Sequence, residues 1–252
     1  MKKQRIIKLK RFKIAYFPIP KCACTSLKLL CYYLEGKHKF PIKKIKLQRK
    51  FKFLFYPKFI FHPKIVTEND VHDFWGYQRE EINPYLLAEY FKFTVVRDPV
   101  KRFISAYKNR ILFHQDIKNS KFVKVNIQEL GLQEYPEVNF FVQNLKEYMK
   151  LSRQIDIHFS SQSNHLMNDL GFYDFVCPIE DMENLRSKLS QIVGTKIDIP
   201  KTQTGGSPIT LKDLTEESLS KLIEFYAEDY ELLQDYYSVD VIKAEFERVR
   251  NL

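Results

Sequence analysis

The feature that most constrains the fold of this chain is a pattern that occurs three times. In each case a short apolar run leads through a polar loop into a helix-like segment. The apolar runs cover residues 12–19, 91–98 and 173–181. They are rich in Phe, Val, Ile and Tyr, which is typical of buried strands. Because strands that alternate with helices form parallel sheets, we predict an α/β fold with helices covering both faces of the sheet.

Helix signals support this alternation. Asn83 with Pro84 forms a typical helix start, and so does Asp98 with Pro99. Thr215 is the expected cap of one long amphipathic helix, whose first turn contains Glu216 and Glu217. The predicted helices cover residues 25–36, 83–91, 99–113, 182–194 and 215–237.

The length of 252 residues, with 44% hydrophobic residues, suits one domain spanning residues 1–252. The first twenty residues do not read as a signal peptide, because positive charges continue through Lys13 and prolines interrupt the apolar run. No run is long enough to cross a membrane. The cysteines lack the spacing of a disulfide scaffold. We therefore expect a soluble, cytoplasmic protein. The four cysteines are Cys22, Cys24, Cys31 and Cys177.

The charge balance points to anionic partners. The chain has 41 Lys and Arg against 31 Asp and Glu, a formal net charge of +10. Ten of the basic residues, and no acid, lie between Gly36 and Thr67. This segment fits a solvated basic face, or a docking surface for an acidic polymer, a nucleic acid or an anionic membrane. No recognised nucleic-acid motif accompanies it.

The loop "KCACTS", residues 21–26, follows the first predicted strand. Backbone N–H groups at a helix start lack partners within the helix and favour negative charge. Cys22, Ala23 and Cys24 are small enough to let an anion approach, Thr25 and Ser26 add hydroxyl donors, and Lys21 adds a cation. The loop lacks the glycines of a nucleoside triphosphatase loop. Zinc binding by Cys22 and Cys24 is a weaker alternative, because no second pair of ligands follows.

A second loop, "VVRDPVKRFISAY" at residues 95–107, follows the next strand. Arg97 stands at the strand end, where a guanidinium can bind a phosphate with two hydrogen bonds. Ser105 on the following helix can contact the same ligand. Each residue alone fits a structural role equally well. Together, two such loops at neighbouring strand ends indicate a ligand with phosphate groups at two separated positions.

These loops resemble those of the family 2 sulfotransferases, which use 3′-phosphoadenosine 5′-phosphosulfate (PAPS) to sulfate carbohydrate hydroxyls. "PKCACTSLK" resembles the family's 5′-phosphosulfate loop, and "VVRDPVKRFISAY" its 3′-phosphate loop. Similarity continues through "DIHFSSQSNHL", "YDFVCPIEDMENLRSKL" and "IEFYAEDYELL", so it covers nearly the whole chain. The family's proline before Gln162 is Ser161 here. Lys201 and Thr204 resemble a late loop that closes over the nucleotide.

The resemblance implies a three-layer fold like that of P-loop nucleoside triphosphatases, with a central, mainly parallel sheet flanked by helices. It implies that Lys21 neutralises charge on the leaving group, and that Cys22, Ala23, Cys24, Thr25 and Ser26 hold the phosphosulfate. Arg97 and Ser105 would hold the 3′-phosphate. The co-substrate is PAPS, and no metal is required.

The acceptor hydroxyl needs a general base, for which histidine is the commonest choice near neutral pH. His72 lies where related polysaccharide enzymes carry theirs, and we favour it. His62 is the next candidate. Asp70, Asp73 and Glu80 stay open, because some sulfotransferases use a carboxylate. His158 and Gln162 are expected to position a ligand or brace the fold.

The sequence thus predicts a bacterial, cytosolic PAPS-dependent sulfotransferase with a carbohydrate acceptor, possibly already anionic. The segments 37–66 and 113–150 lack a clear counterpart in the family and are expected to determine acceptor specificity. Two alternatives remain. A P-loop-like kinase or other nucleotide-dependent transferase would share the fold, and a non-catalytic basic protein would bind polyanions or contact a membrane surface peripherally.

Overall fold

The computed structural model describes residues 3–36, 68–76, 79–119, 127, 129–200 and 209–251. The segment 37–66 with His38 and His62 lies outside these residues, and so do Lys201 and Thr204. The side chains of Asp70 and Asp73 are likewise outside the description.

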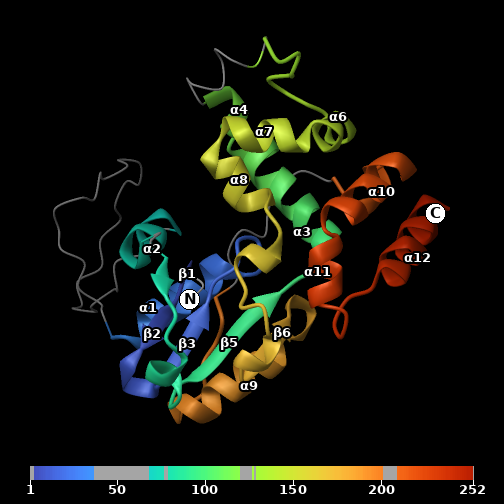
Figure 1. The fold of residues 1–252 in the computed structure, drawn as a ribbon. Coiled ribbons are helices and arrows are strands. Elements are labelled where there is room, and N and C mark those ends of the chain that lie inside the picture. The colour runs from blue at the N-terminus through green and yellow to red at the C-terminus, as the bar shows by residue number, and fades with distance from the viewer. Residues whose placement is uncertain are drawn as a thin grey trace, which may run out of the picture.

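A mainly parallel sheet forms the centre of the described structure (Figure 1). Its strands run in the order β2, β3, β5, β6. Ile14 of β3 lies opposite Phe91 of β5, and Phe93 lies opposite Phe175 of β6, both in parallel register. The edge strand β2 pairs with β3 in antiparallel register. The strand bounds are Ile7–Leu9 for β2, Ile14–Phe17 for β3, Phe91–Val96 for β5 and Phe175–Pro178 for β6.

Helices flank this sheet, as the alternation predicted. Leu27 and Leu30 of α1 (Cys24–Leu34) and Leu185 of α9 (Met182–Val193) belong to one buried cluster with the strands. A second cluster is built mainly from helices, several of which lie above the sheet in Figure 1. Its longer helices are α3 (Pro99–Ala106), α6 (Val138–Gln143), α7 (Leu145–Leu151), α8 (Arg153–Phe159), α10 (Glu216–Phe225), α11 (Ala227–Leu232) and α12 (Val239–Arg250).

Smaller elements complete the described structure. Helix α2 (Glu68–Trp75) lies against α1, and α4 (Asp116–Asn119) follows a π-helical segment at Tyr107–Phe113 that continues from α3. Strands β1 (Lys3–Gln4) and β4 (Glu80–Glu81) form a separate antiparallel pair. Within the described residues, no helix combines the length and the apolar character that crossing a bilayer requires.

Three of the predicted helices differ in the structure. The helix expected over 99–113 is α-helical only to Ala106 and continues as the π-helical segment Tyr107–Phe113. Residues 84–87 form only a 3₁₀ turn capped by Asn83, because Tyr85 and Leu86 are exposed and offer no apolar face to hold a longer helix. The predicted helix 215–237 is divided at Tyr226 into α10 and α11. The Tyr226 hydroxyl donates to the carbonyl of Phe159 at 2.7 Å, and this buried bond holds the break.

Arg102 is the largest fully buried side chain of the fold. Its Nε donates to the carbonyl of Pro20 at 2.9 Å, and its Nη1 donates to the carbonyl of Ser160, also at 2.9 Å. These bonds join α3 to the loop after β3 and to the end of α8. These partners replace part of the hydration that the guanidinium loses on burial, while its Nη2 has no hydrogen-bond partner in the described structure.

We predict that Arg102→Met lowers the free energy of unfolding by about 3 kcal/mol or more, because it leaves two buried carbonyls without donors. Urea denaturation measures this change. The matched control is Lys101→Met. The neighbouring Lys101 forms only a half-buried ion pair with Glu245, at 2.7 Å, so its loss should cost no more than about 1 kcal/mol. Equal losses in the two variants would contradict the role of Arg102.

Candidate functional site

The first predicted loop joins β3 to α1 through an unusual backbone. Lys21 and Ala23 have φ values of 68° and 54°, a left-handed conformation that residues with a side chain rarely adopt. Ala23 is the N-cap of α1, and no side chain caps the helix there. The first helical hydrogen bond runs from Leu27 N–H to Ala23 O. The preceding N–H groups of α1 therefore form an anion-binding helix start.

The second loop is held by Gln162. The backbone N–H of Arg97 donates to Oε1 of Gln162 at 3.1 Å, and Nε2 of Gln162 donates to the Arg97 carbonyl at 2.7 Å. Gln162 is itself fixed by the buried Asp229, which accepts its backbone N–H at 2.8 Å. The role expected for Gln162 as a brace therefore has a specific partner, namely the backbone of Arg97.

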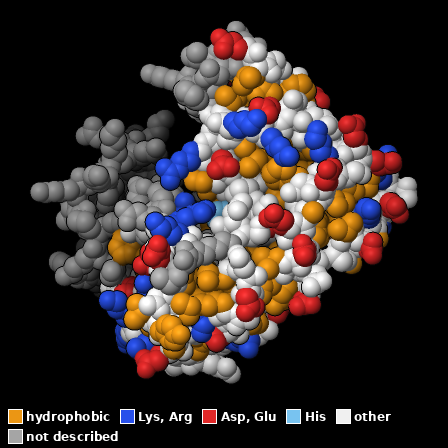
Figure 2. Space-filling view, in the orientation of Figure 1, with side chains coloured by type: hydrophobic (Ala, Val, Ile, Leu, Met, Phe, Trp, Pro, Cys, Tyr) orange, Lys and Arg blue, Asp and Glu red, His pale blue; other side chains and the backbone are white. Residues whose placement is uncertain are grey.

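A cavity of about 610 Å³ opens at the carboxyl ends of β3 and β5. On the face shown in Figure 2, Lys and Arg side chains gather beside a hollow in which a histidine is visible. In the described part of the chain the cavity lining contains no Asp or Glu. Its cations are Arg5, Lys21, Lys28, Arg97, Arg110 and Arg153. Arg110 pairs with Asp116 at 2.5 Å, outside the lining. The excess of basic side chains in the described lining suits an anionic ligand.

Most of the predicted site residues line this one cavity. The first loop contributes five of them, the second loop contributes Arg97 and Ser105, and α2 contributes His72. Nε of Arg97 is buried and has no hydrogen-bond partner in the described structure, so it has a donor to offer to a ligand. The five from the first loop are Lys21, Ala23, Cys24, Thr25 and Ser26.

Two candidates lie elsewhere. Cys22 is fully buried outside the cavity lining, its thiol contacts Oε1 of Gln162 at 3.4 Å, and its backbone N–H donates to Ile19 O. Burial raises the pKa of the Cys22 thiol to about 12, so it stays neutral. Glu80 is exposed and pairs with Lys8 at 2.7 Å. No three His, Cys, Asp or Glu side chains of the described residues come together as a metal ion would need.

His72 makes two contacts across α1. Its Nε2 lies 3.2 Å from Oγ1 of Thr25, and its Nδ1 lies 3.0 Å from Nζ of Lys28. Burial first, and then the charge of Lys28, lower the pKa of His72 to about 4. The ring is therefore neutral at physiological pH. Sequence reasoning missed Lys28, although its spacing of three residues from Thr25 places both side chains on one helix face.

His158 lines the same cavity from α8. Its Nδ1 lies 2.7 Å from the carbonyl of Gln154. A carbonyl can only accept, so Nδ1 carries the proton in the neutral ring. Burial, followed by the charge of Arg110, lowers the pKa of His158 to about 3.

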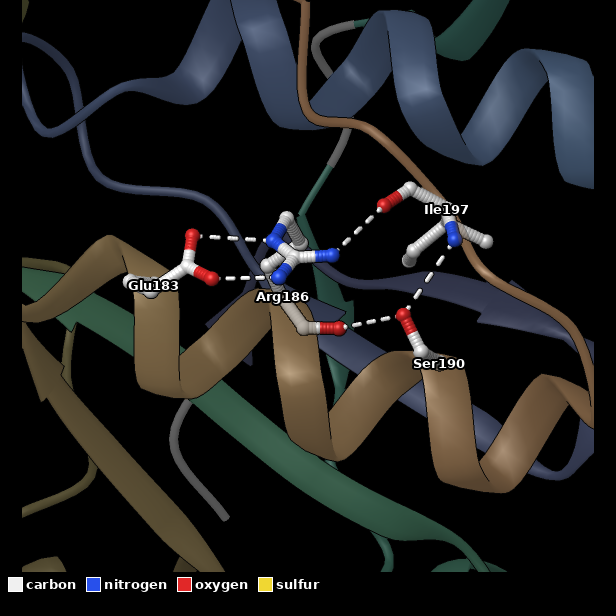
Figure 3. A network of polar contacts seen from close by, with 4 residues as sticks. All are labelled: Glu183, Arg186, Ser190 and Ile197. Carbon is white, nitrogen blue, oxygen red and sulfur yellow. Dashed lines mark hydrogen bonds and ion pairs between the residues drawn. The ribbon is translucent and has the colours of Figure 1, made fainter.

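The segment after α9 forms another wall of the cavity. The Arg186 guanidinium pairs with Glu183 and donates to Ile197 O at 3.4 Å, while Ser190 Oγ accepts the N–H of Ile197 at 3.2 Å (Figure 3). These contacts tie Ile197 to α9. Two residues further along, Ile199 reaches the cavity and gives it an apolar surface.

The fold and the cavity define an α/β protein that presents a helix start and several cations to an anionic ligand. The model of the sulfotransferase family matches residues 4–238. The chain therefore belongs to the sulfotransferase family, and the resemblance found in its two loops is confirmed. It is a transferase that moves a sulfuryl group to an acceptor. No curated protein and no solved structure matches the chain.

We predict that the protein loses stability as the pH falls from about 6.5 to about 4. In this window the unfolded chain binds protons at His72 and His158, whereas the folded chain does not, so stability must rise with pH. Urea unfolding at several pH values measures the slope. His72→Gln and His158→Gln should each make it shallower than in the parent protein. An unchanged slope in both variants would contradict rings that stay neutral in the folded protein.

Proposed function

We propose that this sulfotransferase moves the sulfuryl group of PAPS to a hydroxyl of a carbohydrate acceptor. One observation carries the proposal. A single cavity is lined by the helix start after β3, by Arg97 after β5 and by Ser105. The described lining of this cavity contains six basic residues and no carboxylate. A donor with a phosphosulfate at one end and a ribose phosphate at the other needs both groups of donors in one cavity.

The residues present fit this donor. Lys21 and the uncapped N–H groups of α1 suit the phosphosulfate, with Thr25 and Ser26 as further donors. The buried, unpartnered Nε of Arg97 suits the 3′-phosphate, as does the hydroxyl of Ser105. When bound, PAPS supplies an activated sulfuryl group.

The protein's own part in the reaction is alignment, charge stabilisation and proton removal. Lys21 stabilises the negative charge that develops on the leaving oxygen, because it lines the cavity from the loop that precedes the helix start proposed for the phosphosulfate. His72 takes the proton of the acceptor hydroxyl at its Nε2.

The acceptor proposed is a carbohydrate that is itself anionic, because Arg5 and Arg153 line the cavity in addition to the residues proposed to hold the donor. The segments 37–66 and 113–150 are proposed to recognise it. We further propose that the chain acts as one domain in the bacterial cytoplasm, that no metal takes part, and that any membrane contact is peripheral.

Donor binding provides the first test. Adenosine 3′,5′-bisphosphate without magnesium should raise the unfolding free energy by about 2.7 kcal/mol at a hundredfold excess over its Kd. Adenosine 5′-phosphate, which lacks the 3′-phosphate, is the matched control and should stabilise less. Labelled-sulfate transfer from PAPS to a panel of anionic glycans then tests the reaction.

Two other outcomes would favour the alternatives. Magnesium-dependent ATP binding without any effect of the bisphosphate would favour a kinase. Salt-sensitive glycan binding without any effect of either nucleotide would favour a polyanion-binding protein.

Two variants should separate catalysis from donor binding. Lys21→Ala should lower kcat roughly 100-fold or more with little change in donor affinity, because its contact strengthens as charge develops. Arg97→Ala should chiefly raise the donor KM, because the 3′-phosphate takes no part in bond making. Steady-state kinetics in both substrates measures the split, with Lys101→Ala as a control that removes a cation outside the cavity lining. The same kinetic change in both variants would contradict these separate roles.

A further inference from the structure

Lys28 is an unusual lysine. It lies one turn into α1, only 3% of its surface is exposed, and its ammonium nitrogen is 3.0 Å from Nδ1 of His72. On the other side of the ring, Nε2 is 3.2 Å from the Thr25 hydroxyl. Trp75 donates from Nε1 to the Lys28 carbonyl at 3.0 Å, which fastens α2 to α1. Thr25, His72 and Lys28 therefore form one chain of contacts along the cavity wall.

The protonation state of Lys28 determines which nitrogen of His72 is basic. An ammonium can only donate, so a charged Lys28 makes Nδ1 the acceptor and leaves the proton of the neutral ring on Nε2. In that form Nε2 has no lone pair for an acceptor hydroxyl. A neutral Lys28 amine can instead accept the Nδ1 proton, which leaves Nε2 with its lone pair free.

We propose that Lys28 and His72 form a two-residue base in which the Lys28 amine is the final proton acceptor. The inference rests on the sulfuryl transfer proposed above. As the acceptor oxygen bonds to sulfur, its proton moves to Nε2 of His72 and the Nδ1 proton moves to Nζ of Lys28. The sulfur–oxygen bond of the donor breaks with its electron pair staying on the phosphate. The imidazole ends neutral and the positive charge ends on Lys28.

The surroundings explain why a relay is needed. Burial, followed by the charges of Lys28, Arg5, Arg110 and Lys21, lowers the pKa of His72 to about 4. When the Lys28 amine is neutral, burial and the other three charges still lower the pKa of the ring. An imidazole with a lowered pKa is a weak final acceptor near neutral pH. An amine next to it supplies the missing basicity.

The surroundings of Lys28 lower its pKa, so its amine becomes neutral at a lower pH than that of an exposed lysine. Among the described residues, the titratable and charged groups that act on it are Arg5, Cys24, Cys31 and His72. Burial is the largest effect and lowers the Lys28 pKa, as does the charge of Arg5, whereas Cys24 and Cys31 act in the opposite direction.

His158 lacks such a partner. Its Nδ1 proton is held by the Gln154 carbonyl, which cannot take a proton, so that ring has no relay. This difference distinguishes the two cavity histidines. It assigns the relay to α1 and α2 rather than to α8.

The first test is a direct observation of the ring without any donor. In the full-length protein, ¹⁵N NMR of labelled histidine should show His72 changing from the Nε2–H to the Nδ1–H form as the pH is raised and Lys28 loses its proton. Lys28→Met should abolish this change while leaving His158 in the Nδ1–H form. A His72 ring that keeps one tautomer across the titration in the parent protein would overturn the proposal.

The second test compares two substitutions with transfer kinetics. Lys28→Arg keeps a permanent donor at Nδ1 and locks the proton on Nε2, so kcat should fall roughly 100-fold. Lys28→Met frees the ring to act alone and should lose only about 10-fold, with the acid limb of its pH profile moved to lower pH. Bisphosphate binding and thermal midpoints serve as controls for folding. Activity of Lys28→Arg equal to or above that of Lys28→Met would overturn the pair.

The two proposals fail in different ways. If the parent protein shows no transfer to any glycan but His72 changes tautomer with Lys28, the coupled pair stands and the proposed reaction falls. If transfer proceeds but the tautomer change and the difference between the two variants are both missing, the reaction stands and the pair is overturned.

Discussion

The site depends above all on the buried guanidinium of Arg102. It donates to Pro20 in the loop after β3 and to Ser160 at the end of α8, so two segments far apart in the sequence share one charged group. From Ser160 the chain reaches Gln162, whose side-chain amide binds both polar groups of the Arg97 backbone. The loops after β3 and β5 are therefore fixed relative to each other by one connected set of buried hydrogen bonds. A ligand that spans two separated loops requires such rigidity, because each ångström of error weakens its alignment.

This rigidity supports features that would otherwise be unfavourable. The backbone at Lys21 and Ala23 is left-handed, α1 begins without a side-chain cap, and six cations line one cavity without a described carboxylate. Each costs stability in the free protein, and the proposed anionic ligand would offset the last two on binding. The site is thus organised before the ligand arrives. Burial, together with the same positive field, keeps the nearby histidines neutral, so the electrostatics that suit an anion also influence which groups can accept protons.

Much of this could be predicted from local sequence, and the misses share a cause. The three strands, the helices after them and the mainly parallel sheet follow from short-range patterns that the structure confirms. The break at Tyr226 could not be predicted from such patterns, because Tyr226 is held by a hydrogen bond to Phe159, 67 residues away in the chain. Arg102 reads in sequence as one of several surface cations of a helix, and only the fold shows that it is buried. Cys22 was grouped with its small neighbours, whereas the turn directs it inward to Gln162.

The pairing of Lys28 with His72 shows where such reasoning ends. The two residues are 44 positions apart, and the segment between them is mostly outside the described residues. A sequence can propose a histidine as a base, but the base strength depends on what stands beside the ring. Here α1 supplies both the helix start that suits an anion and, one turn later, the amine that contacts the imidazole. Anion binding and proton removal would then be properties of one helix, and a change in the position of α1 would alter both together.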